Sequence, residues 1–230
     1  MRKRRLVGLA VGIGLAALAL GLLGRRARSR DAEAAGEGGG ASATLAIDPA
    51  PLVVVNGAFD DVTISPGSGP SVSVVAFGVR DASEAVRCER DDQRGRVVLS
   101  VRPGRRLDVF VPPGVAVRLC VAKSRSAVYG VDDVDVRCAK SAIHLHDVAG
   151  TVRLRCAKTR ADVVLARDRA TRSVDAEVAK GRVAIAVPST PGGVYDVRSA
   201  KGHVDVPGSV EGGIPVKIRA AKASVAVRAA

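Results

Sequence analysis

The sequence predicts an all-β fold: a single-domain β-solenoid of stacked two-strand repeats, 17–22 residues each, preceded by one N-terminal transmembrane helix. Three observations lead to this prediction. An Ala-Lys pair recurs through the second half of the chain, apolar residues alternate on either side of it, and one long uncharged run lies near the N-terminus. The hydrophobic content of 47% with only 2% aromatic residues favours a thin core of small branched side chains, which suit pleated strands.

The uncharged run covers residues 6–24 and would span about 28 Å as a helix, close to the thickness of a bilayer core. A cleaved signal peptide is the alternative, but its apolar region is usually shorter and is followed by small residues. Here arginines follow at once, which favours a retained anchor. Basic residues stand on both sides of the run, so they do not fix its direction; we expect the β domain to lie outside the cytoplasm.

The strong positive charge is concentrated around this run. Of the 36 basic residues, eight flank the run. The remaining 28 compare with 23 acidic residues, so the rest of the chain is nearly balanced in charge. A body that is nearly balanced and has few aromatic residues gives no prediction of nucleic-acid binding. We divide the chain into a basic N-terminus (1–5), an anchor or signal helix (6–24), a basic then Gly/Ala-rich linker (25–50), an irregular β region or solenoid cap (51–116) and regular repeats (117–230).

The repeat is defined by six lysines that follow an alanine. Apolar residues recur six, four and two positions before each lysine, as at Val117, Leu119 and Val121, and this alternation predicts a strand with one buried face. Three and five positions after the lysine the apolar residues have the opposite parity, as at Ile143 and Leu145. A one-residue slip of this kind marks a corner, and the small residue after each lysine suits it. Stacking such units would bury a continuous core.

The first half, 51–116, alternates less regularly, and its expected strands cover 52–55, 61–64, 71–77, 96–101 and 107–111. Short motifs here and in the repeats resemble the bacterial putative-adhesin domain family, a toastrack-like domain of unknown function with Gly-Asp-Val-type strand repeats. These motifs are Val55-Asn56-Gly57 with Val62-Thr63-Ile64, the segment Leu107 to Val115, and the units Gly181-Arg182-Val183, Gly202-His203-Val204 and Ala223-Ser224-Val225. The resemblance covers roughly 51–230 and implies an envelope association and no catalytic residues. Arg, His or Ser stands where the family usually has Asp.

The lysines are the candidate anion-binding residues, because the slip at the preceding alanine would turn all six outward along one corner. Inward-pointing unpaired ammonium groups would be too costly to bury. A row of cations could bind a repeating anion such as a teichoic acid, an acidic polysaccharide or lipid headgroups. The simpler interpretation is a duplicated corner that needs a soluble residue. The row consists of Lys123, Lys140, Lys158, Lys180, Lys201 and Lys222.

The cysteines allow a disulfide between Cys138 and Cys156, which occupy the same position in neighbouring repeats. Their parallel Cβ directions are unfavourable for that bond, and buried thiols are the alternative. His144 and His146 alternate on one strand near Asp147, a pattern more typical of a solvated face than of a metal site. We predict no metal and no cofactor.

No nucleophile motif or phosphate-binding loop occurs, so we predict a protein that is not an enzyme. The acids Asp132, Asp133 and Asp135 cluster at a return turn, and a carbohydrate-active β-helix enzyme stays the least favoured alternative. The favoured function is a membrane-tethered, envelope-facing repeat protein with a structural, adhesion-like or binding role. Its partners would be the membrane, through residues 6–24, and anionic envelope polymers or another envelope protein. A regulatory docking partner in envelope-stress signalling is a second alternative.

Overall fold

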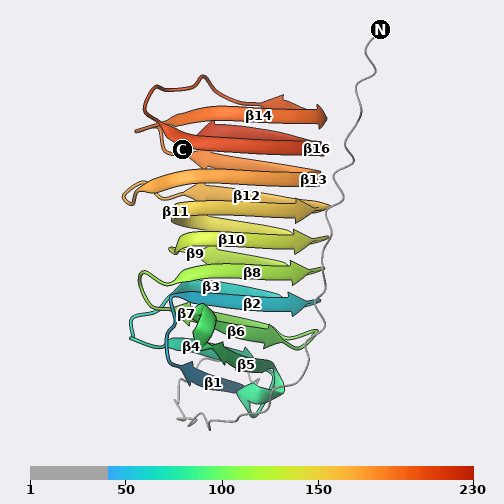
Figure 1. The fold of residues 1–230 in the computed structure, drawn as a ribbon. Coiled ribbons are helices and arrows are strands. Elements are labelled where there is room, and N and C mark those ends of the chain that lie inside the picture. The colour runs from blue at the N-terminus through green and yellow to red at the C-terminus, as the bar shows by residue number, and fades with distance from the viewer. Residues whose placement is uncertain (1–40) are drawn as a thin grey trace.

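The computed structural model describes residues 41–230, and this part of the chain is all-β, as predicted (Figure 1). Its strands form one hydrogen-bonded sheet of 16 strands, with short 3-10 helices at Ala82–Glu84 and Asp92–Arg94. The expected helix at 6–24 lies outside the described residues, and within them no helix is long and apolar enough to span a bilayer. The strands are β1 (Ser42–Ile47), β2 (Leu52–Ala58), β3 (Asp61–Pro66), β4 (Val72–Phe77), β5 (Val86–Asp91), β6 (Arg96–Val101), β7 (Arg106–Val111), β8 (Ala116–Ala122), β9 (Arg125–Tyr129), β10 (Asp132–Ala139), β11 (Ala142–Ala157), β12 (Thr159–Leu165), β13 (Thr171–Val187), β14 (Gly193–Lys201), β15 (Val204–Asp205) and β16 (Ile214–Ala229).

The sheet curls so that the chain forms stacked coils, each with one strand on either side of a corner. On one side of the stack β8, β10 and the second half of β11 pair in parallel; on the other side β9, the first half of β11 and β12 do so. The aligned columns of the sequence lie side by side, since Val117 pairs with Val134 and Val134 with Val152. Parallel neighbours of this kind stand about 4.8 Å apart, which sets the rise of each coil.

The coils do not follow one another in chain order at the two ends of the stack. The β2–β3 coil lies between the β6–β7 coil and the β8–β9 coil. At the far end β16 lies between β13 and β14, so Lys222 is in register with both Lys180 and Lys201. The order of the lysines along the corner therefore differs from their order in the chain, because Lys222 precedes Lys201.

The core is one continuous column of valine, leucine and isoleucine side chains between the two sides of the stack. In the coils from β8 to β13, the residues six, four and two positions before the corner lysine are buried. The residues three and five positions after that lysine are buried as well. In the terminal β14–β15 coil, Tyr195, Val197 and Val206 are only half-buried, because no further coil covers them. Small side chains fill the narrow interior without large aromatic rings.

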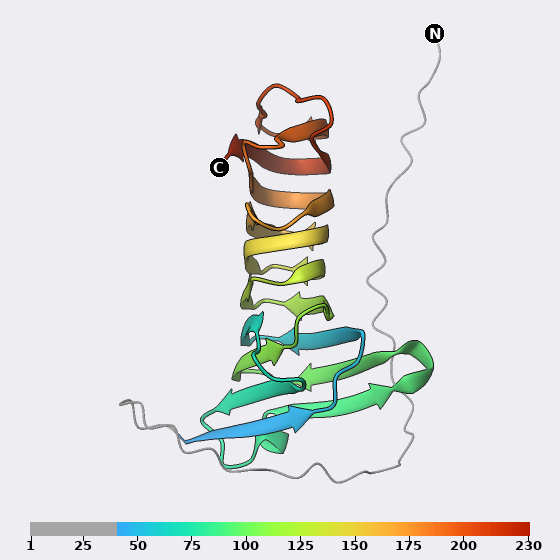
Figure 2. The ribbon, with the colours of Figure 1, turned by 90° about the vertical axis from the view of Figure 1, so that its left-hand side faces the viewer.

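The opposite end of the stack is closed by antiparallel strands. β5 pairs with β6, and β1 and β4 extend the other side beyond β7. These strands splay sideways from the stack, as Figure 2 shows. Two strands lie outside those expected: β1 lies within the 25–50 segment expected to be a linker, and β5 lies between the expected strands at 71–77 and 96–101. β2, β3, β6 and β7, by contrast, are full members of the stack.

Candidate functional site

The corner between the two sides of the stack brings the candidate lysines together. Ala122 is half-buried, Lys123 is exposed and Ser124 is buried. Ala122 and Lys123 are thus two consecutive residues that point away from the core. All six lysines of the row are exposed, as the phase slip predicts. We call Lys123, Lys140, Lys158, Lys180, Lys222 and Lys201, in this spatial order, the lysine ladder.

The turn itself is made by the lysine in the first three of these corners. Lys123, Lys140 and Lys158 have φ values of 55°, 55° and 56°, in the left-handed region that costs a non-glycine residue about 1 kcal/mol. The small residue that follows does not supply the tight turn that we expected of it. Instead this residue, which is Ser124, Ser141 or Thr159, is buried inside the corner.

The later corners are built differently, since β13 and β16 run through them without a break. Gly181 has a φ of 130°, and a Cβ at this position would lie 1.9 Å from the carbonyl oxygen of Thr159. Gly202 has a φ of 134°, and a Cβ at this position would lie 2.1 Å from the carbonyl oxygen of Ala223. Glycine lets these corners pack tightly while the lysine before each glycine keeps an extended backbone.

Phe59 occupies the next ladder position beyond Lys123. Val53 is in register with Val117, the N–H of Phe59 donates to the carbonyl of Ala122 at 3.0 Å, and Phe59 has a φ of 59°. The corner of the β2–β3 coil thus has phenylalanine in place of lysine. An alignment built on lysine misses this coil, although Ala58 and the apolar residues around it have the same spacing.

A column of buried polar side chains runs inside the corner. The Ser124 hydroxyl donates to Asp60 Oδ1 at 2.5 Å, and the N–H of Ser124 donates to Ser141 Oγ at 3.3 Å. The hydroxyls of Ser141 and Thr159 each donate to the carbonyl two residues earlier. Asp60 is 3% exposed, and burial raises its pKa although the Ser124 hydrogen bond opposes this. Its second oxygen, Oδ2, has no hydrogen-bond partner.

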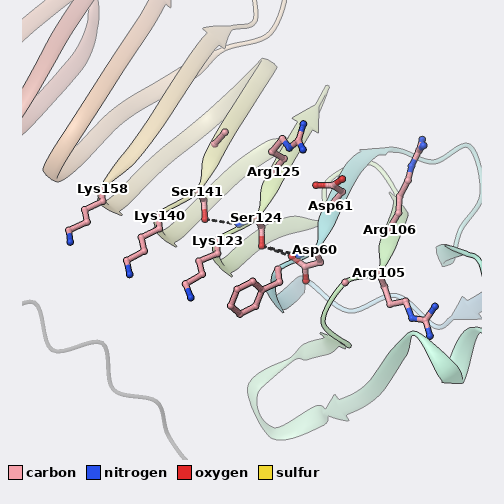
Figure 3. Close-up of a pocket in the computed structure, with 13 residues that line it drawn as sticks. Asp60, Asp61, Arg105, Arg106, Lys123, Ser124, Arg125, Lys140, Ser141 and Lys158 are labelled. Carbon is pink, nitrogen blue, oxygen red and sulfur yellow. Dashed lines mark hydrogen bonds between the residues drawn. The ribbon is translucent and has the colours of Figure 1, made fainter.

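An open groove of about 680 Å³ lies along the Phe59 end of the ladder. Figure 3 shows Lys123, Lys140 and Lys158 extending in a parallel row to the same side of the corner. The ammonium group of Lys123 lies 4.4 Å from the centre of the Phe59 ring. The cationic residues that line the groove are Arg105, Arg106, Lys123, Arg125, Lys140 and Lys158, and the acidic ones are Asp60 and Asp61.

Within residues 41–230, no ladder lysine forms an ion pair with a carboxylate. Every ion pair within residues 41–230 has an arginine or a histidine as its cation, such as Arg118 with Asp135 at 2.8 Å. Two ammonium groups about 5 Å apart repel by about 0.8 kcal/mol in water before salt screening. The flexible stems lower that repulsion by spreading the charges. A multivalent anion would remove it, so the ladder favours such a ligand.

The two column cysteines are brought together but not bonded. Cys138 and Cys156 are in register, buried, and have their Sγ atoms 3.0 Å apart as free thiols. The pKa of Cys156 is raised because it shares a hydrogen bond with Cys138 and because it is buried. Thr159 Oγ1 lies 3.4 Å from Cys138 Sγ, so the pair continues the buried polar column.

The acidic cluster considered for catalysis is paired with arginines. Asp132 binds Arg169 at 2.8 Å, and Asp135 binds Arg118. Burial raises the pKa of Asp133, but hydrogen bonds from the Arg172 guanidinium and the Thr151 N–H outweigh this and hold it below its usual value. The Asp132 carboxylate thus holds the turn that contains Arg169, whereas Asp135 links the neighbouring strands β10 and β8.

The two histidines of β11 also have neighbours of their own. His144 Nδ1 lies 3.6 Å from an Asp162 oxygen, and the ring of His146 lies beside Tyr129 with 6.2 Å between ring centres. Within the described part of the chain, no three His, Cys, Asp or Glu side chains are grouped as metal ligands would be.

Comparison with known proteins gives similarity to solved structures only. No family model matches the chain, and no curated protein does. A putative cell adhesion protein from Clostridium sporogenes is 12% identical, with 84% of this chain and 100% of that chain covered and a TM-score of 0.49. A putative adhesin from Bacteroides fragilis is 11% identical over 84% of this chain and 97% of that chain, with a TM-score of 0.41. A putative lipid binding protein from Parabacteroides distasonis is 11% identical, covers 85% and 98%, and has a TM-score of 0.27. Adhesins, the proteins that the strand repeat resembles, are thus among the structures similar to this chain.

Proposed function

We propose that this protein is a non-catalytic binding module, with an adhesion-like role, whose basic corner binds a linear anionic polymer of the cell envelope. The observation that carries the proposal is the lysine ladder: exposed ammonium groups, one per coil, without a carboxylate partner within the described residues. Such a row keeps a modest repulsion between neighbouring cations without a ligand, and it matches a ligand that repeats its charge along one direction.

The form of the site favours a polymer over a compact ligand. The groove is open along the corner, and the ladder continues beyond it from Lys158 to Lys180, Lys222 and Lys201. Each coil adds one cation about 4.8 Å from the last, so affinity would grow with the number of coils contacted. A single small anion could use only two or three of them.

The proposal includes a membrane tether through residues 6–24 and a position of the β-solenoid outside the cytoplasm. The length of the uncharged run and the arginines that follow it support a retained helix. Protease treatment of intact cells tests the topology. Digestion of residues 41–230 without cell lysis is the expected result, and full protection of this segment would contradict it.

The binding proposal is tested on the full-length protein with Lys123, Lys140 and Lys158 changed to Gln together. We expect the affinity for polyphosphate and for polygalacturonate at low salt to fall about tenfold or more. The slope of log affinity against log salt should decrease by about two, because each phosphate contact contributes about 0.7–0.9 to it.

The matched control replaces Arg80, Arg153 and Arg167 with Gln, which removes the same charge from exposed residues outside the groove and outside the ion pairs. The control should bind nearly as well as the unchanged protein. An equal loss in both variants would show that only net charge matters, and it would overturn the proposal of a specific corner site.

A further inference from the structure

We propose that Phe59 makes the end of the lysine ladder a site for a sugar ring, so that the polymer bound by the groove is an acidic polysaccharide. This inference rests on the proposed function and goes beyond it by naming the ligand class. Its structural basis is an exposed aromatic ring that takes the place of a lysine in the same corner column, at the wall of the basic groove.

The backbone at Phe59 has the left-handed conformation that the lysines of this corner column share, with φ values of 55°, 55° and 56° at Lys123, Lys140 and Lys158. A φ of 59° is common for glycine and asparagine but is a genuine outlier for a bulky aromatic residue. The conformation is held from both sides, because the Phe59 N–H donates to Ala122 and its carbonyl accepts from the Gly104 N–H at 2.9 Å. Because the lysine corners have the same backbone, the turn itself does not require a phenylalanine at this position.

The ring gains little from the protein in return. Phe59 is 57% exposed and adds almost nothing to the core. The ammonium group of Lys123 lies over one face of the ring, 4.4 Å from the ring centre. With a cation over one face and more than half of the side chain exposed, Phe59 presents an apolar surface and a charge together, which suits a sugar with an acidic substituent.

The surroundings extend this pair into a site. Lys140 and Lys158 continue the row beyond Lys123. Arg105 and Arg106 line the groove from the neighbouring coil, while their guanidinium groups contact the Gly78 carbonyl and the Phe77 ring. The groove volume of about 680 Å³ lies within the usual range for small-molecule sites, about 300–1,000 Å³. A ring stacked on Phe59 would therefore direct the rest of an acidic chain along the ladder.

A membrane surface is the other ligand that combines apolar groups with anions, and the structure favours the polysaccharide. The other large exposed apolar residues within 41–230 are Tyr129, Val194, Val204 and Val210, and the last three belong to the opposite end of the stack. Phe59 is thus a single ring in a hollow rather than part of an apolar patch. A flat bilayer would reach it poorly, whereas a linear chain enters an open groove.

The test compares three ligands with the full-length protein: polygalacturonate, which has both rings and carboxylates, polyphosphate, which has no rings, and vesicles containing phosphatidylglycerol. Phe59→Ala and Phe59→Asn remove the ring, and Phe59→Trp keeps an aromatic surface. Asn tolerates the left-handed backbone, so this variant keeps the corner folded. Thermal unfolding of each variant checks that the stack is intact.

We expect both ring-deleting variants to lose about 5- to 10-fold in affinity for polygalacturonate, as burial of about 40–60 Å² of apolar surface implies. Their affinity for polyphosphate should stay within about twofold, and Phe59→Trp should bind both polymers normally. Unchanged polygalacturonate binding, or an equal loss for both polymers, would overturn the sugar site. A loss confined to the vesicles would overturn it in favour of a membrane contact. Failure of the triple lysine variant to weaken binding would instead remove the proposed function.

Discussion

Gly57 and Asp60 are coupled across the first corner of the stack, and this coupling is open to a direct test. Gly57 stands where the next coils have Val121 and Cys138, so its side chain would point into the core. A Cβ at Gly57 would lie 1.9 Å from Asp60 Oδ2. The buried carboxylate therefore occupies the space that a side chain fills in the other coils. We predict that each substitution changes the effect of the other.

The magnitudes follow from packing and burial. Gly57→Ala alone should destabilise the fold by about 1–3 kcal/mol, because the methyl group must displace the carboxylate. Asp60→Ser alone should change stability by less than about 1 kcal/mol, since it removes both an unpaired buried oxygen and the hydrogen bond from Ser124. In the double variant the methyl group enters the vacated space and gains about 0.8 kcal/mol. The double variant should therefore be about 2–4 kcal/mol more stable than the sum of the single changes predicts.

The assay is urea denaturation of the four full-length proteins at neutral pH, followed by far-ultraviolet circular dichroism, which reports strand content in a chain without tryptophan. Stabilities from the four curves give the coupling energy. A coupling below about 0.5 kcal/mol would refute the reasoning, because contacts that share a space do not behave additively. A Val121→Ala variant shows the cost of deleting a side chain from the same column in a coil without a buried carboxylate.

Two further predictions concern charges inside the fold. Because the pKa of Asp60 is raised in the folded state, its contribution is full below its unfolded pKa of about 3.9 and is lost as the pH rises through the folded value. The stability of Asp60→Asn relative to the unchanged protein should therefore increase between about pH 4 and pH 7 in denaturation curves, and a constant difference would contradict the raised pKa. Arg169→Ala should destabilise the fold by about 2 kcal/mol, because this side chain donates to the Asp132 and Asp147 carboxylates and to two backbone carbonyls at the return turns. The exposed Arg167→Ala serves as its control and should stay within about 0.5 kcal/mol.

The local sequence pattern predicts much of the lysine ladder. It does not predict which residues of other coils line the groove with these lysines. The alternation around Lys140 determines which side chains are buried, because a strand between core and solvent must alternate. Phe59 escaped the alignment because its corner lacks the lysine that defined the repeat, and Arg105 belongs to a coil without an Ala-Lys pair. Phe59 and Arg105 line one groove with Lys123 because of which coils are neighbours, and this is a long-range property.

By itself, the sequence determined the all-β class, the period of the repeat, the corner and the outward direction of the lysines. These are local consequences of side-chain parity and of the cost of burying an ammonium group. Only the tertiary structure decided the order of the coils, with β2–β3 inserted at one end and β16 at the other. Parallel coils with nearly identical apolar columns can stack in more than one order, so the sequence pattern of a single coil does not choose its neighbour. That choice places Phe59 against Lys123, and with it the groove proposed to bind a polysaccharide.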